Sequence, residues 1–378
     1  ILMPALAVGG AVSAMAAQFI GAGKWDALDR LTKSGVIVNF WMTGLITVLL
    51  LAFDRPALEL FLGPNSPAVD IARQVSYPIK LIWSREEEFL RDPLRPMAAV
   101  RFRGALDAKG MPVAIEAVSV TEGPTEGISD KRGPKLDSAA LEGLTGKSYA
   151  VANRRIAQVY VKSPTTLAYW RSVGNSMNDF FYETFLDELA DKGGQDPYAL
   201  RLHLLEGNAR LTTLLKAVVD LAGGWKAGVF TAPDGSKRAR GIAMASPFGS
   251  ETAAMAEVSM VDGQIKVHDL WQAIDPGRIV NPAIIEAQVN SAVALGVSQV
   301  LVEEAAYKDG LRVARNFDGY PILTPDRMPR VHVRIVESGA PMGGIGEPGL
   351  PAVPPAVANA VSRLLGRRMR KMPLTDLA

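Results

Sequence analysis

The chain of 378 residues contains no cysteine and only three histidines, His203, His268 and His332. The absence of cysteine excludes disulfide bonds and any cysteine-bound iron–sulfur cluster within this sequence. The wide separation of the histidines argues against a zinc site, which needs several ligands of this kind close together. The sequence therefore predicts no metal ion bound directly by its own side chains.

A strong net charge is also lacking, because 41 basic residues face 39 acidic ones and the formal charge is only +2. Nothing in this balance favours a nucleic acid as a partner. A chain of this length accommodates two or three domains. Charge is scarce over residues 1–73, and we expect domain boundaries that give a transmembrane fragment over 1–73 and two further regions over 74–239 and 240–378.

The N-terminal part has the composition of a membrane segment. Residues 36–53 carry no charge, and as a helix they would span about 27 Å, close to the hydrocarbon thickness of a bilayer. Residues 1–20 are also uncharged and rich in alanine and glycine, and the polar turn 21–26 separates the two runs. We expect a hydrophobic helical hairpin. A secretory signal peptide is the alternative, although no basic segment precedes the first run.

The segment Ala16–Gly23 reads AAQFIGAG and precedes a polar loop and a long apolar helix. It resembles the multidrug and toxic compound extrusion (MATE) transporters, which typically have twelve spans. Two spans cannot enclose a substrate cavity between two repeats, so we do not expect transport. We interpret the chain as a MATE-like fragment joined near Arg73 to a second piece. Residues 1–60 would contact a bacterial inner membrane; without a genuine membrane segment, the chain would be cytoplasmic or periplasmic.

The remainder alternates between strand and helix patterns, which predicts an α+β fold of mixed sheets with flanking helices. Strands are expected at 78–83, at 100–103 and 112–121 as a hairpin, at 158–161, at 256–274 around an Asp-Gly turn, and at 331–336. Helices are expected at 176–192, from 197, at 283–303 and at 352–361, the first with one buried face. The stretch 123–146 is predicted to be a surface excursion, and the charged residues expected to be solvated there are Glu122, Glu126, Asp130, Lys131 and Arg132.

The stretch around which this part is organised is residues 342–351, MGGIGEPGLP, in which Glu347 lies between glycines and prolines. Such a backbone can approach a ligand closely and is then held stiff. A surface turn is the simpler interpretation of this composition. The small-residue helix expected over 352–361 changes the balance, because a helix N-terminus offers unpaired N–H groups to an anion.

The sequence GIGEPG at 344–349, the pattern Pro-x-x-Pro-Pro-Ala-x-x-Asn-Ala that follows, and residues 366–374 carry a resemblance. Together they resemble the C-terminus of the molybdopterin-binding subunit of xanthine dehydrogenase-like molybdenum hydroxylases. Within that family the resemblance is closest to the large subunit of isoquinoline 1-oxidoreductase and related aldehyde dehydrogenases. It implies that Glu347 is the active-site base and that Gly346 contacts the cofactor.

Two further segments fit the same family. WRSVG at 170–174, followed by the pattern Glu-x-Phe-x-Asp-Glu-Leu-Ala, resembles the segment lining the molybdenum site, which implies cofactor contacts by Arg171, Ser172, Val173 and Gly174. Arg171 could instead pair with Asp179 or Glu183. A later Asp-x-Gly, Asn-Pro and helical glutamine imply that Gly277, Asn281 and Gln288 lie against the pterin. A helical glutamine can also be satisfied locally, and His332 is expected to be a sheet residue rather than a ligand.

The resemblance implies an oxidoreductase with a molybdenum–molybdopterin cofactor, in the cytosine dinucleotide form. Its substrates would be N-heteroaromatic compounds or aldehydes, and its electrons would leave through iron–sulfur clusters on a separate small subunit. The resemblance covers about residues 75–378, and no Gly-Gly-Phe-Gly loop is present. We therefore expect an incomplete cofactor site, and molybdopterin binding that is weak or absent. The alternative is an inactive MATE fragment or membrane-anchored chimera.

Overall fold

The computed structural model describes residues 19–52, 80–129 and 136–375, together with residues 12, 15, 16, 71, 74, 77 and 377. The chain divides into two compact units, Ile1–Ser84 and Arg85–Ala378. The predicted boundary at 239/240 inside the larger unit remains a prediction.

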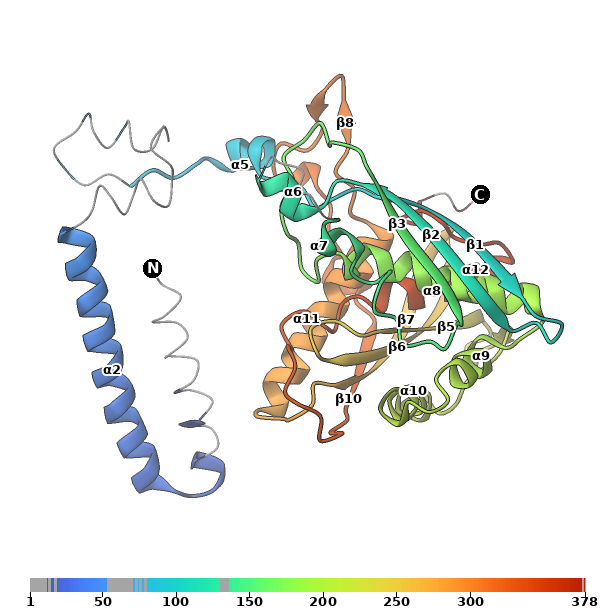
Figure 1. The fold of residues 1–378 in the computed structure, drawn as a ribbon, viewed down its shortest axis with the longest axis horizontal. Coiled ribbons are helices and arrows are strands. Elements are labelled where there is room, and N and C mark those ends of the chain that lie inside the picture. The colour runs from blue at the N-terminus through green and yellow to red at the C-terminus, as the bar shows by residue number, and fades with distance from the viewer. Residues whose placement is uncertain are drawn as a thin grey trace. The chain divides into compact units, whose positions relative to one another are not determined.

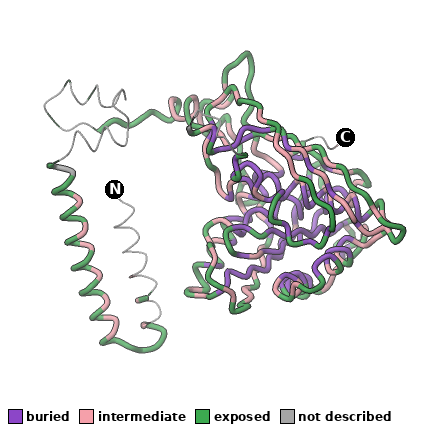
Figure 2. Tube along the Cα trace, in the orientation of Figure 1, coloured by how far each residue is buried: buried purple, intermediate pink, exposed green. Residues whose placement is uncertain are grey.

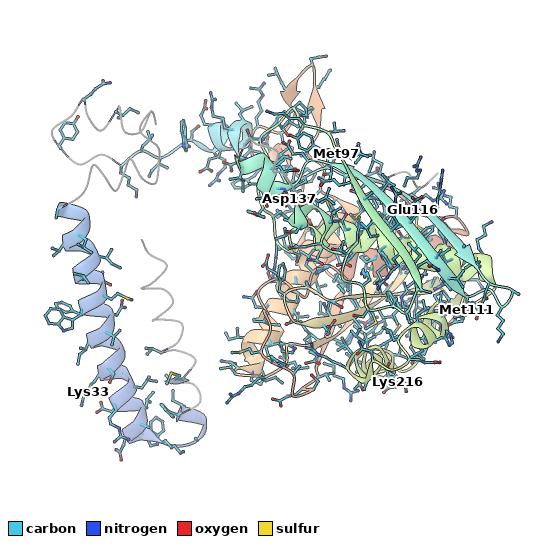
Figure 3. All side chains as sticks on the ribbon, viewed as in Figure 1. Lys33, Met97, Met111, Glu116, Asp137 and Lys216 are labelled. Carbon is cyan, nitrogen blue, oxygen red and sulfur yellow. The ribbon has the colours of Figure 1, made fainter. Side chains whose placement is uncertain are left out.

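In the first unit, α2 (Trp25–Ala52) is a single helix of 28 residues that contains the predicted apolar run as far as Ala52. Its large side chains are exposed, with Phe40 71% and Trp41 70% accessible. Lys33 lies near the beginning of the helix (Figure 3), and it pairs with Asp29 at 2.6 Å. The helix is long and apolar enough to cross a bilayer. Most of the first predicted helix, residues 1–20, lies outside the described residues.

The second unit contains a three-stranded sheet in the order β1-β2-β3 (Figure 1). Strand β1 (Ala99–Leu106) pairs antiparallel with β2 (Pro112–Thr121), which confirms the predicted hairpin. Strand β3 (Asn153–Tyr160) adds parallel to β2 and begins earlier than predicted. The strand predicted at 78–83 is wrong over its described part. Residues 80–84 are not in a strand, since no described strand pairs with them, and α5 begins at Arg85.

A five-stranded sheet follows in the order β10-β7-β6-β5-β4. The predicted Asp-Gly turn joins β6 to β7, with Asp262 at φ 49° and Gly263 at φ 75°, the left-handed pair that this hairpin requires. Strand β10 adds parallel to β7. The strand bounds are β4 Val229–Thr231, β5 Lys237–Ala245, β6 Glu251–Val261, β7 Gln264–Asp275 and β10 Arg330–Ile335.

Strand alternation divides the buried side chains of this sheet between two cores, because successive residues point to opposite faces. On β5, Ile242 and Met244 belong to the core shared with the three-stranded sheet, whereas Ala243 and Ala245 face the other. Buried positions therefore continue through the middle of the larger unit (Figure 2).

The helices fill the two cores. The first core takes α8 (Asn175–Gly193), α9 (Pro197–Leu204) and α10 (Ala209–Leu221), and the second takes α11 (Pro282–Leu301) and α12 (Val353–Leu365). Helix α11 is also long and apolar enough to cross a membrane, but half of its apolar stretch is buried inside the protein. The remaining short elements are α5 Arg85–Arg91, α6 Pro124–Ser129, α7 Ser138–Leu141, β8 Tyr307–Lys308, β9 Leu311–Arg312, η1 Phe317–Gly319 and η2 Pro325–Arg327.

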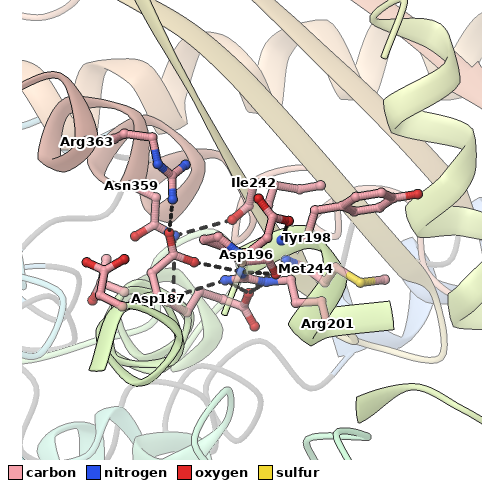
Figure 4. Close-up of polar contacts among 12 residues, drawn as sticks. Asp187, Asp196, Tyr198, Arg201, Ile242, Met244, Asn359 and Arg363 are labelled. Atoms are coloured by element: carbon pink, nitrogen blue, oxygen red, sulfur yellow. Dashed lines mark hydrogen bonds and ion pairs between the residues drawn. The ribbon is translucent and has the colours of Figure 1, made fainter. Parts of the chain in front are cut away.

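Helix α8 is buried on more than the single face predicted, because its acidic residues lie inside a network of ion pairs (Figure 4). Arg201 is fully buried and donates to Glu183 at 3.0 Å and to Asp187 at 2.6 Å. Arg363 of α12 reaches Asp187 at 3.4 Å. A buried carboxylate that lost its cation would be strongly destabilising, so these pairs fix α8 against α9 and α12.

Two of the charged residues predicted to be solvated are buried, and the prediction is wrong for them. Glu122 accepts hydrogen bonds from the Tyr160 hydroxyl at 3.0 Å and from the Ser163 N–H at 2.8 Å. Glu126 accepts the N–H of Gly123 at 3.2 Å. These partners satisfy the carboxylates away from water. Residues 130–132 lie outside the described part.

A glycine in β5 sets how closely α12 approaches the sheet. A Cβ at Gly241 would lie 2.2 Å from the carbonyl oxygen of Ala356 and 2.3 Å from the nitrogen of Ala360, both backbone atoms of α12. Only a residue without a side chain permits this contact.

We expect Gly241→Ala to lower the free energy of unfolding by about 3 kcal/mol, at the upper end of overpacking effects, because backbone cannot move aside as a side chain can. Urea denaturation measures the change. Gly319→Ala is the control, since a Cβ at this exposed position of η1 would come no closer than 3.2 Å to another atom. Equal stability of the two variants would contradict this account of the packing.

Candidate active site

The carboxylate of Glu347 is held by the loop that precedes α8. The backbone N–H of Ser172 donates to Oε1 of Glu347 at 2.9 Å, and the Ser172 hydroxyl donates to the Glu347 carbonyl oxygen at 2.8 Å. Ser172 is fully buried and Glu347 is half-buried. Two segments 175 residues apart thus meet at the predicted base.

The loop adopts an unusual backbone conformation to make this contact. Ser172 and Val173 both have positive φ, 72° and 49°. Such angles are uncommon for residues other than glycine and unfavourable for the β-branched Val173, and they concentrate at functional sites. Gly174 is the N-cap of α8 and lies so close to α7 that a Cβ would be 2.1 Å from the carbonyl oxygen of Ala139.

Arg171 ties the glutamate loop to α11. Its Nε donates to the Gly346 carbonyl oxygen at 2.8 Å, Nη1 donates to Ser291 Oγ at 3.0 Å, and Nη2 donates to Gln288 Oε1 at 2.9 Å. The alternative pairing with Asp179 or Glu183 does not occur, because those acids pair with Lys147 and, in the case of Glu183, also with Arg201. Partial burial lowers the pKa of Arg171, and the charge of Glu347 opposes that shift.

The first part of the glutamate loop is anchored through its backbone. Gly343 donates to the Pro276 carbonyl oxygen at 2.8 Å, and Gly344 donates to that of Phe248 at 2.9 Å. Gly277, at φ 72°, approaches so closely that a Cβ would lie 2.1 Å from the carbonyl oxygen of Pro341. Gly277 therefore shapes the approach to the loop.

Gln288 lies within α11 and Asn281 is its N-cap, and the two side chains make different contacts. Gln288 accepts from Arg171 and so joins the group around Glu347. Asn281 caps the helix by accepting the N–H groups of Ala283 and Ile284 at 3.1 and 3.3 Å. The predicted sheet position of His332 is confirmed: it lies in β10, with Nε2 2.9 Å from Asp269.

One neighbour of Glu347 was not predicted. Glu142 follows α7, and its carboxylate accepts a hydrogen bond from Nδ2 of Asn175 at 3.3 Å. Burial raises the pKa of Glu142, the Gly174 N–H opposes this, and the negative charge of Glu347 raises the pKa further. No motif marks Glu142 in the sequence, so only the fold could reveal that it lies close enough to Glu347 to feel its charge.

The donor groups around Glu347 fit a ligand rich in acceptor atoms, as a pterin is. Within the described residues, the backbone N–H groups of Ile345, Gly346 and Glu347 and the side-chain amide nitrogen of Gln288 have no hydrogen-bond partner. A Cβ at Gly346 would meet nothing within 4 Å, so open space lies beside this tip. Successive N–H donors next to open space suit oxo or phosphate oxygens.

Comparisons with known proteins connect most of this chain with a family. Residues 65–205 and residues 203–329 each match a molybdopterin cofactor-binding domain. Residues 65–329 belong to the molybdopterin cofactor-binding domain family. Residues 1–82 match MatE, so the two kinds of match overlap around the predicted junction. Both resemblances inferred from the sequence are confirmed.

Among curated relatives, the beta subunit of isoquinoline 1-oxidoreductase from Brevundimonas diminuta is 28% identical over 320 residues, which cover 82% of this chain and 40% of the relative. A nicotinate dehydrogenase subunit of Pseudomonas putida is 28% identical over 335 residues, 82% of this chain and 28% of the relative. This chain therefore spans less than half of these relatives, which are named as subunits.

The solved structures agree on the fold. Quinoline 2-oxidoreductase from Pseudomonas putida 86 superposes with a TM-score of 0.69 over 82% of this chain and 65% of that one, at 14% identity. Aldehyde oxidoreductase from Desulfovibrio desulfuricans gives a TM-score of 0.62 over 77% of this chain and 49% of that one, at 16% identity. The predicted α+β class with mixed sheets is confirmed.

We expect Arg171→Ala to loosen the glutamate loop. Losing the three contacts of this side chain should lower the local opening free energy by about 2 kcal/mol, which corresponds to roughly 30-fold faster amide exchange in residues 342–350. Hydrogen exchange with mass spectrometry measures this. Arg370→Ala removes an exposed pair with Glu188 and is the control. Unchanged exchange in Arg171→Ala would show that the arginine does not hold the loop.

Proposed function

We propose that this chain carries the base-bearing part of a molybdopterin-dependent hydroxylase that oxidises N-heteroaromatic compounds or aldehydes with oxygen derived from water. The observation that supports it best is the group formed by Glu347, Ser172, Arg171 and Gln288, which the family pattern connects and which the fold assembles from three segments. The names of two relatives, isoquinoline 1-oxidoreductase and nicotinate dehydrogenase, support the N-heteroaromatic part of this substrate class.

In this proposal Glu347 acts as a general base and accepts a proton during the reaction, as a carboxylate held in position can do. The Ser172 N–H fixes Oε1, so the other oxygen, Oε2, is the one free to face a reactant. Arg171 keeps the loop in place. Ser172, Val173, Gly174 and Gly346 form the wall toward the cofactor, and Gly277 and Asn281 shape and cap its surroundings.

Molybdenum–molybdopterin, in its cytosine dinucleotide form, would supply the oxidising centre when bound. Gln288 and the N–H groups of residues 345–347 are the groups that would hold it. Because the sequence has no cysteine, electrons would pass to iron–sulfur clusters on a small partner subunit.

Glu347→Gln tests the proposed base. The variant should lower turnover of an N-heteroarene or aldehyde, per bound molybdenum atom, by at least about 100-fold, since general-base catalysis contributes about 10²–10⁴. Molybdenum is counted by elemental mass spectrometry in the full chain, produced in a host that makes the cofactor. Glu304→Gln, at an exposed carboxylate, is the control.

Equal turnover per molybdenum in the Glu347 and Glu304 variants would overturn the assignment of the base. A complete absence of molybdenum from the purified chain would favour the second candidate, an inactive membrane-anchored fragment. That candidate is supported by the MatE match and by the exposed apolar surface of α2.

Membrane association through α2 has its own test. Replacing Val48 and Leu45, both exposed near the middle of the apolar run, with arginine should move the chain from the membrane pellet to the soluble fraction. Each arginine near the centre of a span costs about 3 kcal/mol on insertion scales. Replacing Asp29 and Lys33 with each other keeps the charge and is the control. An unchanged distribution would show that α2 is not the anchor.

A further inference from the structure

A pocket of about 150 Å³ lies beside the glutamate loop and has no role in the function proposed above. Its walls come from the segment after α7, from the first turns of α8 and from the turn between β5 and β6. Two wall residues connect it to the site: Glu142 lies close enough to Glu347 to influence it electrostatically, and the carbonyl oxygen of Phe248 accepts the N–H of Gly344. An apolar cavity of about 150 Å³ holds one benzene ring, so a single ring fits.

The pocket wall contains a buried carboxylate oxygen that lacks a partner. Asp179 is 1% exposed, and its Oδ2 has no hydrogen bond within the part of the chain that the structure describes. An unpaired buried acceptor is costly, and a donor from a ligand would satisfy it. Burial, opposed by Lys147, raises the pKa of Asp179 to about 7.

Lys147 also lines the pocket, but its ammonium group is directed elsewhere. It donates to Oδ1 of Asp179, and to Glu183 and the Met244 carbonyl oxygen at 3.4 Å each. An ammonium has three N–H groups, and these three acceptors match them. Among the charged lining residues, the two carboxylates of Glu142 and Asp179 outnumber the one ammonium, and Oδ2 of Asp179 is an acceptor without a partner among the described residues.

These carboxylates do not make a metal site. No cluster of three or more acidic or histidine side chains suitable for a metal ion exists among the described residues. Two carboxylates in the wall of a pocket of this volume suit instead a flat organic cation that donates N–H groups, since charge-assisted hydrogen bonds are the strong ones.

We propose that this pocket binds a cationic, single-ring N-heterocycle through Glu142 and Asp179. The inference rests on the proposed function and narrows it, because it selects N-heteroaromatic substrates bearing N–H donors over aldehydes. The ring would lie next to the loop that carries Glu347.

The test uses three ligands of similar size and different charge with the full chain in detergent, without molybdenum: 4-aminopyridinium, aniline and benzoate. Calorimetry should give a Kd for 4-aminopyridinium at least tenfold lower than for neutral aniline, and no binding of benzoate. Glu142→Gln should weaken 4-aminopyridinium binding at least tenfold, whereas Glu304→Gln should leave it unchanged. Equal binding of aniline and 4-aminopyridinium, or full binding by Glu142→Gln, would overturn the proposal.

The pH dependence gives a second readout. The titratable groups that face Asp179 are Lys147 and Glu142 from the segment after α7 and Glu183 from α8 itself. With a pKa of about 7, Asp179 gains its charge between pH 6 and 8, so affinity for the cation should rise about tenfold over that range. Asp179→Asn should remove the rise. A flat profile in the unmodified chain would contradict the role of Asp179.

The outcomes separate this inference from the proposed function. If Glu347→Gln abolishes turnover while Glu142→Gln binds the cation normally, only the pocket assignment fails. If the chain binds 4-aminopyridinium selectively but shows no molybdenum and no turnover, the enzymatic proposal fails and the cation site remains.

Discussion

The buried acids of α8 are the constraint on which the rest of the larger unit depends. Glu183 and Asp187 are fully buried, and Arg201 of α9 pairs with both of them, while Arg363 of α12 also reaches Asp187. Breaking one such pair typically costs about 3–5 kcal/mol, because the remaining charge is buried and is neither paired nor hydrated. Helix α8 is therefore fixed in position, and the loop that precedes its N-terminus is fixed with it.

What that segment holds is a carboxylate. The positive φ angles of Ser172 and Val173 would each be expected to cost about 1–3 kcal/mol, and they turn the Ser172 N–H toward Glu347. Arg171 then binds the same loop from the other side. A rigid helix thus supports a strained turn, the turn positions one acid, and glycine at 346 leaves open space beside it.

The sequence predicts local features well and distant pairings poorly. The Asp262-Gly263 hairpin and the helix expected from residue 197 follow from residues a few positions apart, and both are present. Glu122 was misjudged because its partner Tyr160 lies 38 residues away. At the site, family patterns brought Glu347, Arg171 and Gln288 together, whereas Glu142 carries no pattern and becomes notable only when the fold places it beside them.

Helices α2 and α11 show that apolar composition does not determine where a helix resides. Both are long and apolar enough to cross a bilayer. Half of the apolar stretch of α11 is buried inside the protein, whereas none of that of α2 is. Helix α11 packs against α12, where Gly296 lets Val353 approach so closely that a Cβ would lie 2.8 Å from it. During synthesis α11 is complete before α12 exists, so for that interval the part of its apolar side that α12 covers lacks this cover. A chaperone or the translocation machinery would meet it first.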